Sequence, residues 1–421
     1  MLVDFSVENF GPFRDTATLS LIGAMSDSIH DNLLKSSAVD GGILSSAVIF
    51  GPNASGKTFI IKAIRALQAM VAAPVPPGFD YPWYQPFCLS SETVEAPTTI
   101  TVRAIVDGTL YCYIIAFDRC TVVHESLHGY PGGHKSVIFT RVGNEFRFGR
   151  SQSNGQKSIS AMTSIGSSYL AVAAQFNQET CVAVHREIVQ NIYVLPDERD
   201  ALIRGTVSMI EVNPDVKDMV IRALEIADLG IVDIKCETKD DSGYSRRAGI
   251  HHPFRQFWQT SLVKEDLKVW VEHGFTDTDR STVMPLEKES EGTWQMLGIM
   301  GPLVDALMYG KTIVIDEFGS NLHPLVGRWL ISMFNESRNP HHAQLVAVTN
   351  DHTLLDTKTL LRKDQIYFTH KDPYNGASIL YSLFDCDEDW SDDDLSVRLP
   401  KLYHPVPYIS DEELLKRPRQ Y

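Results

Sequence analysis

The sequence lacks the features that mark a secreted or membrane-spanning protein. No apolar run approaches the roughly 20 residues that cross a bilayer. The N-terminal residues MLVDFSVENF have neither the basic start nor the apolar core of a signal peptide. The six cysteines, at positions 88, 112, 120, 181, 236 and 386, are scattered without paired spacing, which predicts reduced thiols. We therefore expect a cytoplasmic protein that makes no contact with a membrane.

Positive charge and sequence repeats are also scarce. The 421 residues include 38 lysines and arginines against 53 aspartates and glutamates, which gives a net charge of −15. Because neutralisation of phosphates dominates affinity for nucleic acids, we expect any nucleic-acid contact to be indirect and made through a partner. The chain contains no internal repeat and no sustained heptads, so long coiled-coil arms are not expected.

What the sequence does contain is an α/β pattern around a phosphate-binding loop. FGPNASGKT (50–58) fits the motif G-x-x-x-x-G-K-[ST], follows the apolar run SSAVIF and opens the helical segment TFIIKAIRALQAMV. Such a loop turns backbone N–H groups toward a phosphate at the positive end of a helix. The lysine would also assist catalysis at the γ-phosphate, and the threonine hydroxyl would bind Mg²⁺. The predicted ATP-contacting residues of this loop are Gly51, Pro52, Asn53, Ala54, Ser55, Gly56, Lys57, Thr58 and Phe59.

A second half-motif, KTIVIDEFGSNLHP (311–324), places two carboxylates after a short apolar run. A buried parallel strand that ends in Asp-Glu supplies the groups that Mg²⁺ and an attacking water need. We expect Asp316 to hold the metal and Glu317 to polarise the water. Such an acidic pair can also simply cap the next turn, but the phosphate loop favours the catalytic interpretation.

The segment EKESEGTWQML (287–297) places a serine and a glycine at the start of a predicted helix. Ser290 fits an N-terminal hydroxyl and Gly292 permits close approach, so the helix start offers a second anion site. Each chain would thus bind one nucleotide but offer two anion sites. The second site has a use if each chain completes the nucleotide pocket of its neighbour. We therefore predict a head-to-tail two-fold homodimer or a higher homo-oligomer.

These motifs resemble those of the ABC-type "AAA family ATPase" group of bacteria and archaea, which is related to the SMC, RecF and OLD proteins. Ser290-x-Gly292 is similar to the core of the ABC signature, and FSVENFGPFRDTATLSL (5–21) resembles the opening strands of SMC and RecF proteins. The resemblance runs from residue 2 to about 383 and includes PFCL, HESL, ESEGT, IDEFGSNLHP and LLRKDQIYFTHKD in order. The group includes RloA and the ATPase subunits of the PARIS and Septu phage-defence systems.

The resemblance implies an α/β P-loop NTPase fold of ABC/SMC-like type. Its mixed central sheet would carry an antiparallel β lobe and an inserted helical subdomain, with no long coiled coil. It implies that Asn321 and His323 belong to a D-loop and that Arg14 lies beside the nucleotide base. The switch position, usually histidine, is Asn350 here, followed by His352. An asparagine hydrogen-bonds a γ-phosphate but carries no charge, so hydrolysis could be slow or gated.

The implied function is an ATPase that uses ATP and Mg²⁺ as the switch subunit of an anti-phage system. OLD nucleases carry a Toprim domain after the ATPase, but only about 70 residues follow the switch loop here, fewer than such a domain usually has. We therefore expect a separate Toprim- or HNH-like nuclease, or a toxin, as effector. The alternatives are a nucleotide-gated scaffold with little hydrolysis, which Asn350 favours, and a DNA-repair ATPase, which the charge disfavours.

The expected organisation is an N-terminal ATPase lobe (1–165), an inserted helical, partner-binding subdomain (166–261), a C-terminal ATPase lobe (262–383) and an acidic tail (384–421). The sequence HESLH (124–128) fits the zinc-protease motif H-E-x-x-H, but the alternating residues around it predict a strand, on which that chemistry does not work. Gln85 is a candidate for a Mg²⁺-sensing glutamine.

Overall fold

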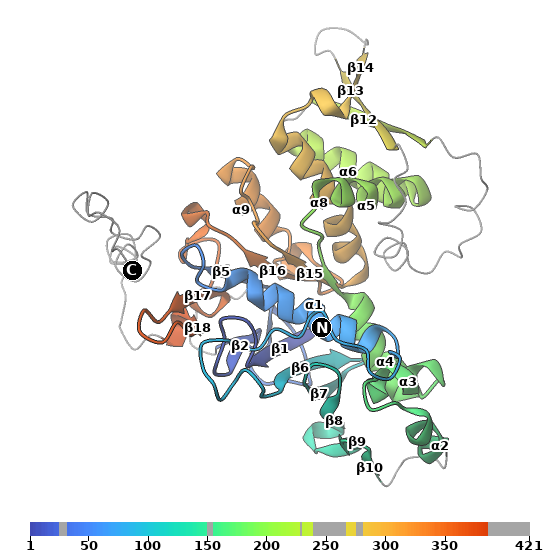
Figure 1. The fold of residues 1–421 in the computed structure, drawn as a ribbon. Helices are drawn as coiled ribbons and strands as arrows, with labels where there is room; N and C mark the ends of the chain where they lie inside the picture. Colours follow the sequence, from blue (N-terminus) through green and yellow to red (C-terminus); the bar gives the residue numbers. More distant parts are fainter. Residues whose placement is uncertain (25–31, 150–154, 228–229, 239–266, 275–280, 386–421) are drawn as a thin grey trace, which may run out of the picture.

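The fold is described from a computed structural model (Figure 1). It describes residues 1–24, 32–149, 155–227, 230–238, 267–274 and 281–385. The predicted acidic tail, apart from its first two residues, lies outside the described residues, as does most of the polar stretch around 237–250.

A mixed six-stranded sheet carries the phosphate loop. Its strands lie in the order β11 (Ile192–Val194), β15 (Thr312–Ile315), β16 (Gln344–Val348), β5 (Ser46–Phe50), β17 (Ile366–Lys371) and β18 (Ser378–Ser382). Five strands are parallel and the edge strand β18 is antiparallel. Strands β5, β15 and β16 are buried along their whole length, which explains their continuous apolar sequence. Because these three neighbours are parallel, the loops that follow them emerge at one edge.

A seven-stranded antiparallel sheet forms the N-terminal β lobe below the central sheet in Figure 1. Its order is β10 (Glu145–Phe148), β9 (Ser136–Val142), β8 (Val122–Gly129), β7 (Thr109–Phe117), β6 (Thr98–Val106), β1 (Leu2–Glu8) and β2 (Ala17–Ser20). Helices α1 (Lys57–Ala72), α3 (Tyr169–Gln175) and α4 (Glu179–Arg186) share one hydrophobic core with this sheet and with one face of the central sheet. The short helix α2 (Gly155–Met162) and the strands β3 (Leu33–Leu34) and β4 (Ile43–Leu44) complete the lobe.

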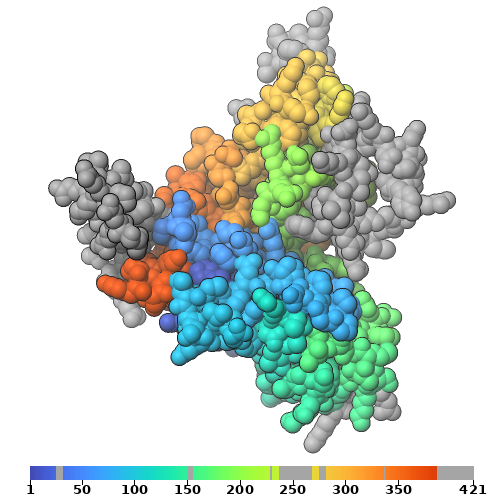
Figure 2. Space-filling model, in the orientation of Figure 1, coloured from blue at the N-terminus to red at the C-terminus, as the bar shows by residue number. Residues whose placement is uncertain are grey.

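The other face of the central sheet packs against a second core, built by helices α5 (Arg199–Val212), α6 (Pro214–Ile226), α8 (Glu291–Tyr309) and α9 (Pro324–Ser332). Helices α5 and α8 lie close together, and Thr206 Oγ1 donates a hydrogen bond to the Gly298 carbonyl at 2.8 Å. A Cβ on Gly301 would lie 2.7 Å from the Thr206 Cα. A three-stranded antiparallel sheet of β12 (Ile231–Thr238), β13 (Leu267–Gly274) and β14 (Ser281–Pro285) covers the far end of these helices (Figures 1 and 2).

The HESLH motif lies on strand β8, as its alternation predicts. Glu125 is fully buried and accepts hydrogen bonds from the Tyr169 and Leu170 amides, at 2.7 and 2.9 Å, where α3 begins. No group of three or more metal-binding side chains occurs in the part of the chain that the structure describes. Glu125 therefore anchors a helix start and is not placed as a catalytic base.

The predicted fold class is confirmed. The mixed central sheet, the antiparallel β lobe and the helices between the two half-motifs are all present. Within the described residues the longest helix is α8, with 19 residues, so these ranges contain no long coiled-coil arm. The proposed division of the chain at residues 165, 261 and 383 stays a prediction.

Candidate functional site

The phosphate loop leaves strand β5 and enters helix α1 through backbone conformations that favour glycine. Gly56 precedes the helix at φ +105° and Ala54 has φ +64°. A Cβ on Gly51 would lie 2.1 Å from Thr369 Oγ1, so only glycine fits beside strand β17. No side chain caps the start of α1, and its first turn holds no acidic residue. The first N–H groups of the helix are therefore available to an anion, which fits a triphosphate.

Lys57 is folded back onto the loop. Its Nζ donates to the carbonyl oxygens of Gly51 at 2.5 Å and Pro52 at 2.9 Å. The residue is 8% exposed, and burial lowers the pKa of Lys57 although the charge of Asp316 opposes this effect. Both partners are neutral carbonyls, and an anionic phosphate oxygen is a stronger acceptor for this ammonium. The loop can therefore release Lys57 toward a triphosphate.

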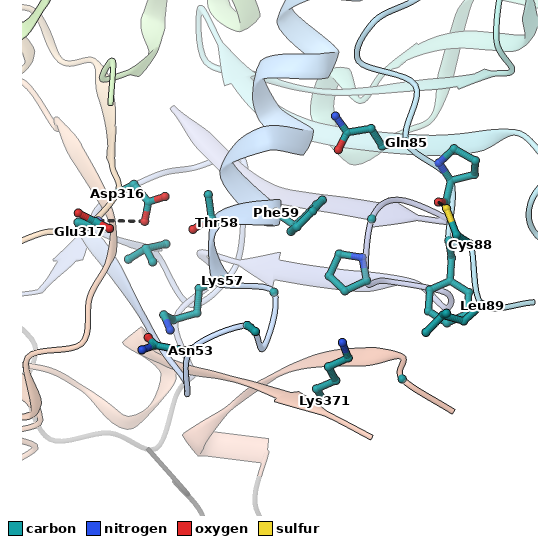
Figure 3. Close-up of a pocket in the computed structure, with 18 of the residues that line it drawn as sticks. Asn53, Lys57, Thr58, Phe59, Gln85, Cys88, Leu89, Asp316, Glu317 and Lys371 are labelled. Atoms are coloured by element: carbon teal, nitrogen blue, oxygen red, sulfur yellow. Dashed lines mark hydrogen bonds between the residues drawn. The ribbon is translucent and has the colours of Figure 1, made fainter. Parts of the chain in front are cut away.

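The loops after β5, β15 and β16 meet around a cavity of about 810 Å³ (Figure 3). The predicted site residues that line it are Asn53, Ala54, Gly56, Lys57, Thr58, Phe59, Asp316, Glu317 and Asn350. Gly51 and Ser55 are buried, and Pro52 is partly buried, in the same loop. The structure thus brings together groups more than 250 positions apart in the sequence. Asp316 Oδ1 accepts the Glu317 N–H at 2.9 Å, and Glu317 has φ +50°, a strained conformation for a non-glycine residue.

The far wall of the cavity consists of residues for which the sequence predicts no role, apart from Gln85. Figure 3 shows Asp316 and Glu317 on one side of Thr58, with Cys88 and Leu89 on the opposite side beyond Phe59. The remaining lining residues of this wall are Gly11, Pro12, Tyr84, Gln85, Pro86, Phe87, Lys371 and Gly376. PFCL and THKD resemble segments of the family, but only the tertiary contacts show that they line the same cavity as the phosphate loop.

The switch loop follows strand β16. Asn350 is exposed and lines the cavity, as predicted for the switch position. Partial burial of its imidazole lowers the pKa of His352, with a further contribution from the Lys57 charge, while Asp351 opposes both. His352 therefore lies within electrostatic reach of the phosphate loop as a mainly neutral imidazole near pH 7.

The signature corner, residues 290–292, begins helix α8 as predicted. Ser290 is the N-cap, and its Oγ accepts the Thr293 N–H at 3.1 Å. A Cβ on Gly292 would lie 2.9 Å from the Asn321 carbonyl oxygen, so the glycine is required within its own chain as well. Gln295 Oε1 accepts the Asn321 N–H at 3.2 Å, which ties the predicted D-loop to the same corner.

Five predicted residues outside the phosphate loop do not line the first cavity. Arg14 Nη2 forms an ion pair with Asp15 Oδ2 at 2.8 Å, and Arg14 does not line the cavity. His323 caps helix α9, where its Nδ1 accepts the Leu325 N–H at 3.3 Å. Ser290, Gly292 and Asn321 likewise lie outside the cavity of their own chain. Contacts of these five residues with a nucleotide stay predictions.

A family described as "AAA domain, putative AbiEii toxin, Type IV TA system" matches residues 46–356. The chain belongs to this AAA-domain family. The match contains the phosphate loop, the signature corner, the Asp316–Glu317 pair and the switch loop. The expected relationship to the AAA family ATPases is therefore confirmed.

Among solved structures, the AAA-domain chain is similar to an SMC head domain from Thermotoga maritima, with 12% identity and a TM-score of 0.43 over 90% of this chain and 98% of that one. It is also similar to an Smc head bound to the C-terminal winged-helix domain of ScpA, with 9% identity and a TM-score of 0.45 over 90% and 97%. A third similar structure is an Smc head with an extended coiled coil from Pyrococcus furiosus. The identity is 9% and the TM-score is 0.36, over 95% of this chain and 99% of that one. No curated protein is similar enough in sequence to count as a relative.

Two further expectations concern the whole chain. Among the described residues, no helix is both long and apolar enough to span a bilayer. The five described cysteines are all free thiols, and Cys386 lies outside the described residues.

Proposed function

We propose that the protein binds and hydrolyses ATP at a site completed by a second copy of the chain. The observation that carries this proposal is the convergence of the phosphate loop, the Asp316–Glu317 pair and Asn350 on one cavity. The membership of the AAA-domain family supports it.

The residues divide the chemistry between them. Lys57 and the first N–H groups of α1 would hold the phosphates, and Thr58 and Asp316 would hold Mg²⁺, which neutralises charge on the phosphate oxygens. Glu317 would orient the attacking water and accept its proton. Its carboxylate is exposed at the cavity, where a water molecule has access.

The signature corner of one copy would complete the site of the other. Ser290, Gly292 and Asn321 lie together at the start of α8, away from the first cavity of their own chain. A two-fold arrangement would bring this corner to the γ-phosphate that the partner holds. ATP would then close the dimer and hydrolysis would reopen it, which makes the nucleotide a two-state switch.

The biological role that we propose is a cytoplasmic switch subunit of an anti-phage system. The description of the family names a toxin and a toxin–antitoxin system. The chain would control a separate effector, a Toprim- or HNH-like nuclease or a toxin, and nucleic acid would be contacted through that partner. Its net charge of −15 is consistent with indirect contact.

The decisive experiment compares phosphate release by the wild type and Glu317→Gln. Loss of a general base predicts a decrease of at least about 100-fold. ATP should convert Glu317→Gln, which binds but does not hydrolyse, to a dimer in light scattering. Glu287→Gln, the same chemical change at an exposed site outside the cavity, is the matched control. Equal rates for wild type and Glu317→Gln would remove the ATPase proposal.

A nucleotide-gated scaffold with little turnover is the second candidate. Asn350 at the cavity favours it, because its amide hydrogen-bonds a phosphate without supplying charge. ATP-dependent dimerisation of the wild type without measurable phosphate release would establish this alternative.

A further inference from the structure

A second cavity, of about 630 Å³, is also lined by the carboxylate pair Asp316 and Glu317. It shares Thr58, Asp316 and Glu317 with the first cavity, so the two meet at the predicted catalytic groups. Its other walls come from Lys62 on α1, residues 195–197 before α5, the starts of α5 and α8, and the predicted D-loop. The second cavity is therefore lined both by Glu291 of the signature corner and by the carboxylate pair.

Arg199, the first residue of α5, occupies a defined position on this wall. Its Nη1 donates to both carboxylate oxygens of Glu291, at 2.6 and 2.8 Å. The guanidinium carbon lies 3.6 Å from the centroid of the Trp294 ring, in the geometry of a cation–π contact. The side chains of Arg199 and Glu291 are 43% and 68% exposed. Exposed ion pairs contribute little to folding, so stability is a poor explanation for this arrangement.

The arrangement matters because of where Glu291 lies. It stands between Ser290 and Gly292, in the corner that would approach the triphosphate of a partner. An unpaired carboxylate there would repel the γ-phosphate and counteract the positive end of α8. The Trp294 ring, one helical turn further along α8, holds the planar guanidinium against that carboxylate.

We propose that Arg199 is a positioning residue that neutralises and orients Glu291, so that the signature corner can accept the triphosphate held by the partner copy. This inference depends on the proposed dimeric site. It assigns no contact between Arg199 and the nucleotide.

The test measures the ATP-dependent dimerisation constant of the full chain in the Glu317→Gln background. Arg199→Met keeps an apolar stem on Trp294 but removes the charge, and should weaken the dimer at least about fivefold. Adding Glu291→Gln should restore the affinity to within about twofold of the parent, because the repelling charge is then gone. Arg199→Lys keeps the positive charge but loses the planar guanidinium, so its dimer affinity should lie between those of the parent and Arg199→Met. Arg204→Ala, on the same helix, is the control and should have no effect.

Three outcomes would overturn the inference. If the Glu317→Gln parent dimerises with ATP and Arg199→Met does not weaken the dimer, Arg199 does not neutralise Glu291 in the way proposed. Only this inference then fails. If Arg199→Met weakens the dimer and Glu291→Gln does not rescue it, Arg199 acts through packing instead. If the Glu317→Gln parent stays monomeric with ATP, the proposed dimeric function fails and the inference fails with it. Should Arg199→Met not fold, the contrast between Arg199→Lys and its Glu291→Gln double variant makes the same comparison.

Discussion

Replacing Glu125 by alanine should destabilise the β lobe strongly. Glu125 and Arg141 are both 0% exposed, and their charged groups lie 3.5 Å apart. The Glu125 carboxylate also accepts the Tyr113 hydroxyl at 2.8 Å and the backbone amides of Tyr169 and Leu170. Alanine would leave all these donors without this acceptor, in a site that water does not reach.

The magnitude follows from the number of groups left unpaired. Removing one partner of a buried ion pair costs about 3–5 kcal/mol. Arg141 keeps carbonyl acceptors at Gly143, Ser164, Ile165 and Ser167, which limits the penalty on its side. Three donors would still lose their acceptor, at about 1–3 kcal/mol each when nothing replaces it. We expect a net loss of about 4 kcal/mol, since such penalties are not additive.

The assay is thermal unfolding of the full chain without nucleotide. For a chain of 421 residues, with about 2.1 cal/mol/K of unfolding entropy per residue, 4 kcal/mol corresponds to a decrease in Tm of about 4–5 °C. Glu125→Gln keeps one carbonyl acceptor and should lose about half as much. Glu145→Ala, an exposed glutamate on β10, should change the stability by less than about 0.5 kcal/mol. A Tm of Glu125→Ala within about 2 °C of the wild type would refute the structural role of this carboxylate.

Three further predictions concern the nucleotide site. Lys57→Ala should abolish the increase in Tm that ATP produces in the wild type. At an ATP concentration of 100 times the dissociation constant, binding stabilises the wild type by about 2.7 kcal/mol. An unchanged increase in Tm would contradict the role of Lys57. Gly292→Ala should cost about 1–3 kcal/mol even without ATP, because its Cβ would meet the Asn321 carbonyl at 2.9 Å; an unchanged Tm would show that this approach is not tight. Partial burial and the Lys57 charge lower the pKa of His352 below 6.5 in the folded chain, so protonation favours the unfolded state and stability decreases as pH falls below 6.5. His352→Asn should therefore lose less stability than the wild type between about pH 7 and pH 5; equal losses would refute this assignment.

The sequence predicts local geometry well where a few neighbouring residues decide it. The phosphate loop, the Ser290 N-cap and the buried strand before Asp316 all form as expected, because their conformations depend on residues within one turn or strand. The alternation around HESLH predicts the strand β8 for the same reason. The fate of Glu125 inside the β lobe depends on Arg141 and on the start of α3, which no local pattern reveals.

By itself, then, the sequence determined the type of each local element and the chemical groups that each carries, because backbone propensity and hydrogen-bonding pattern act over short distances. Only the tertiary structure decided which groups meet. Parallel pairing of β5, β15 and β16 places Lys57, Glu317 and Asn350 at one edge. Packing of α5 on α8 places Arg199 beside Glu291. Such contacts join residues that are from 33 to more than 250 positions apart in the sequence. Burial of the shared cores, rather than any local signal, determines these contacts.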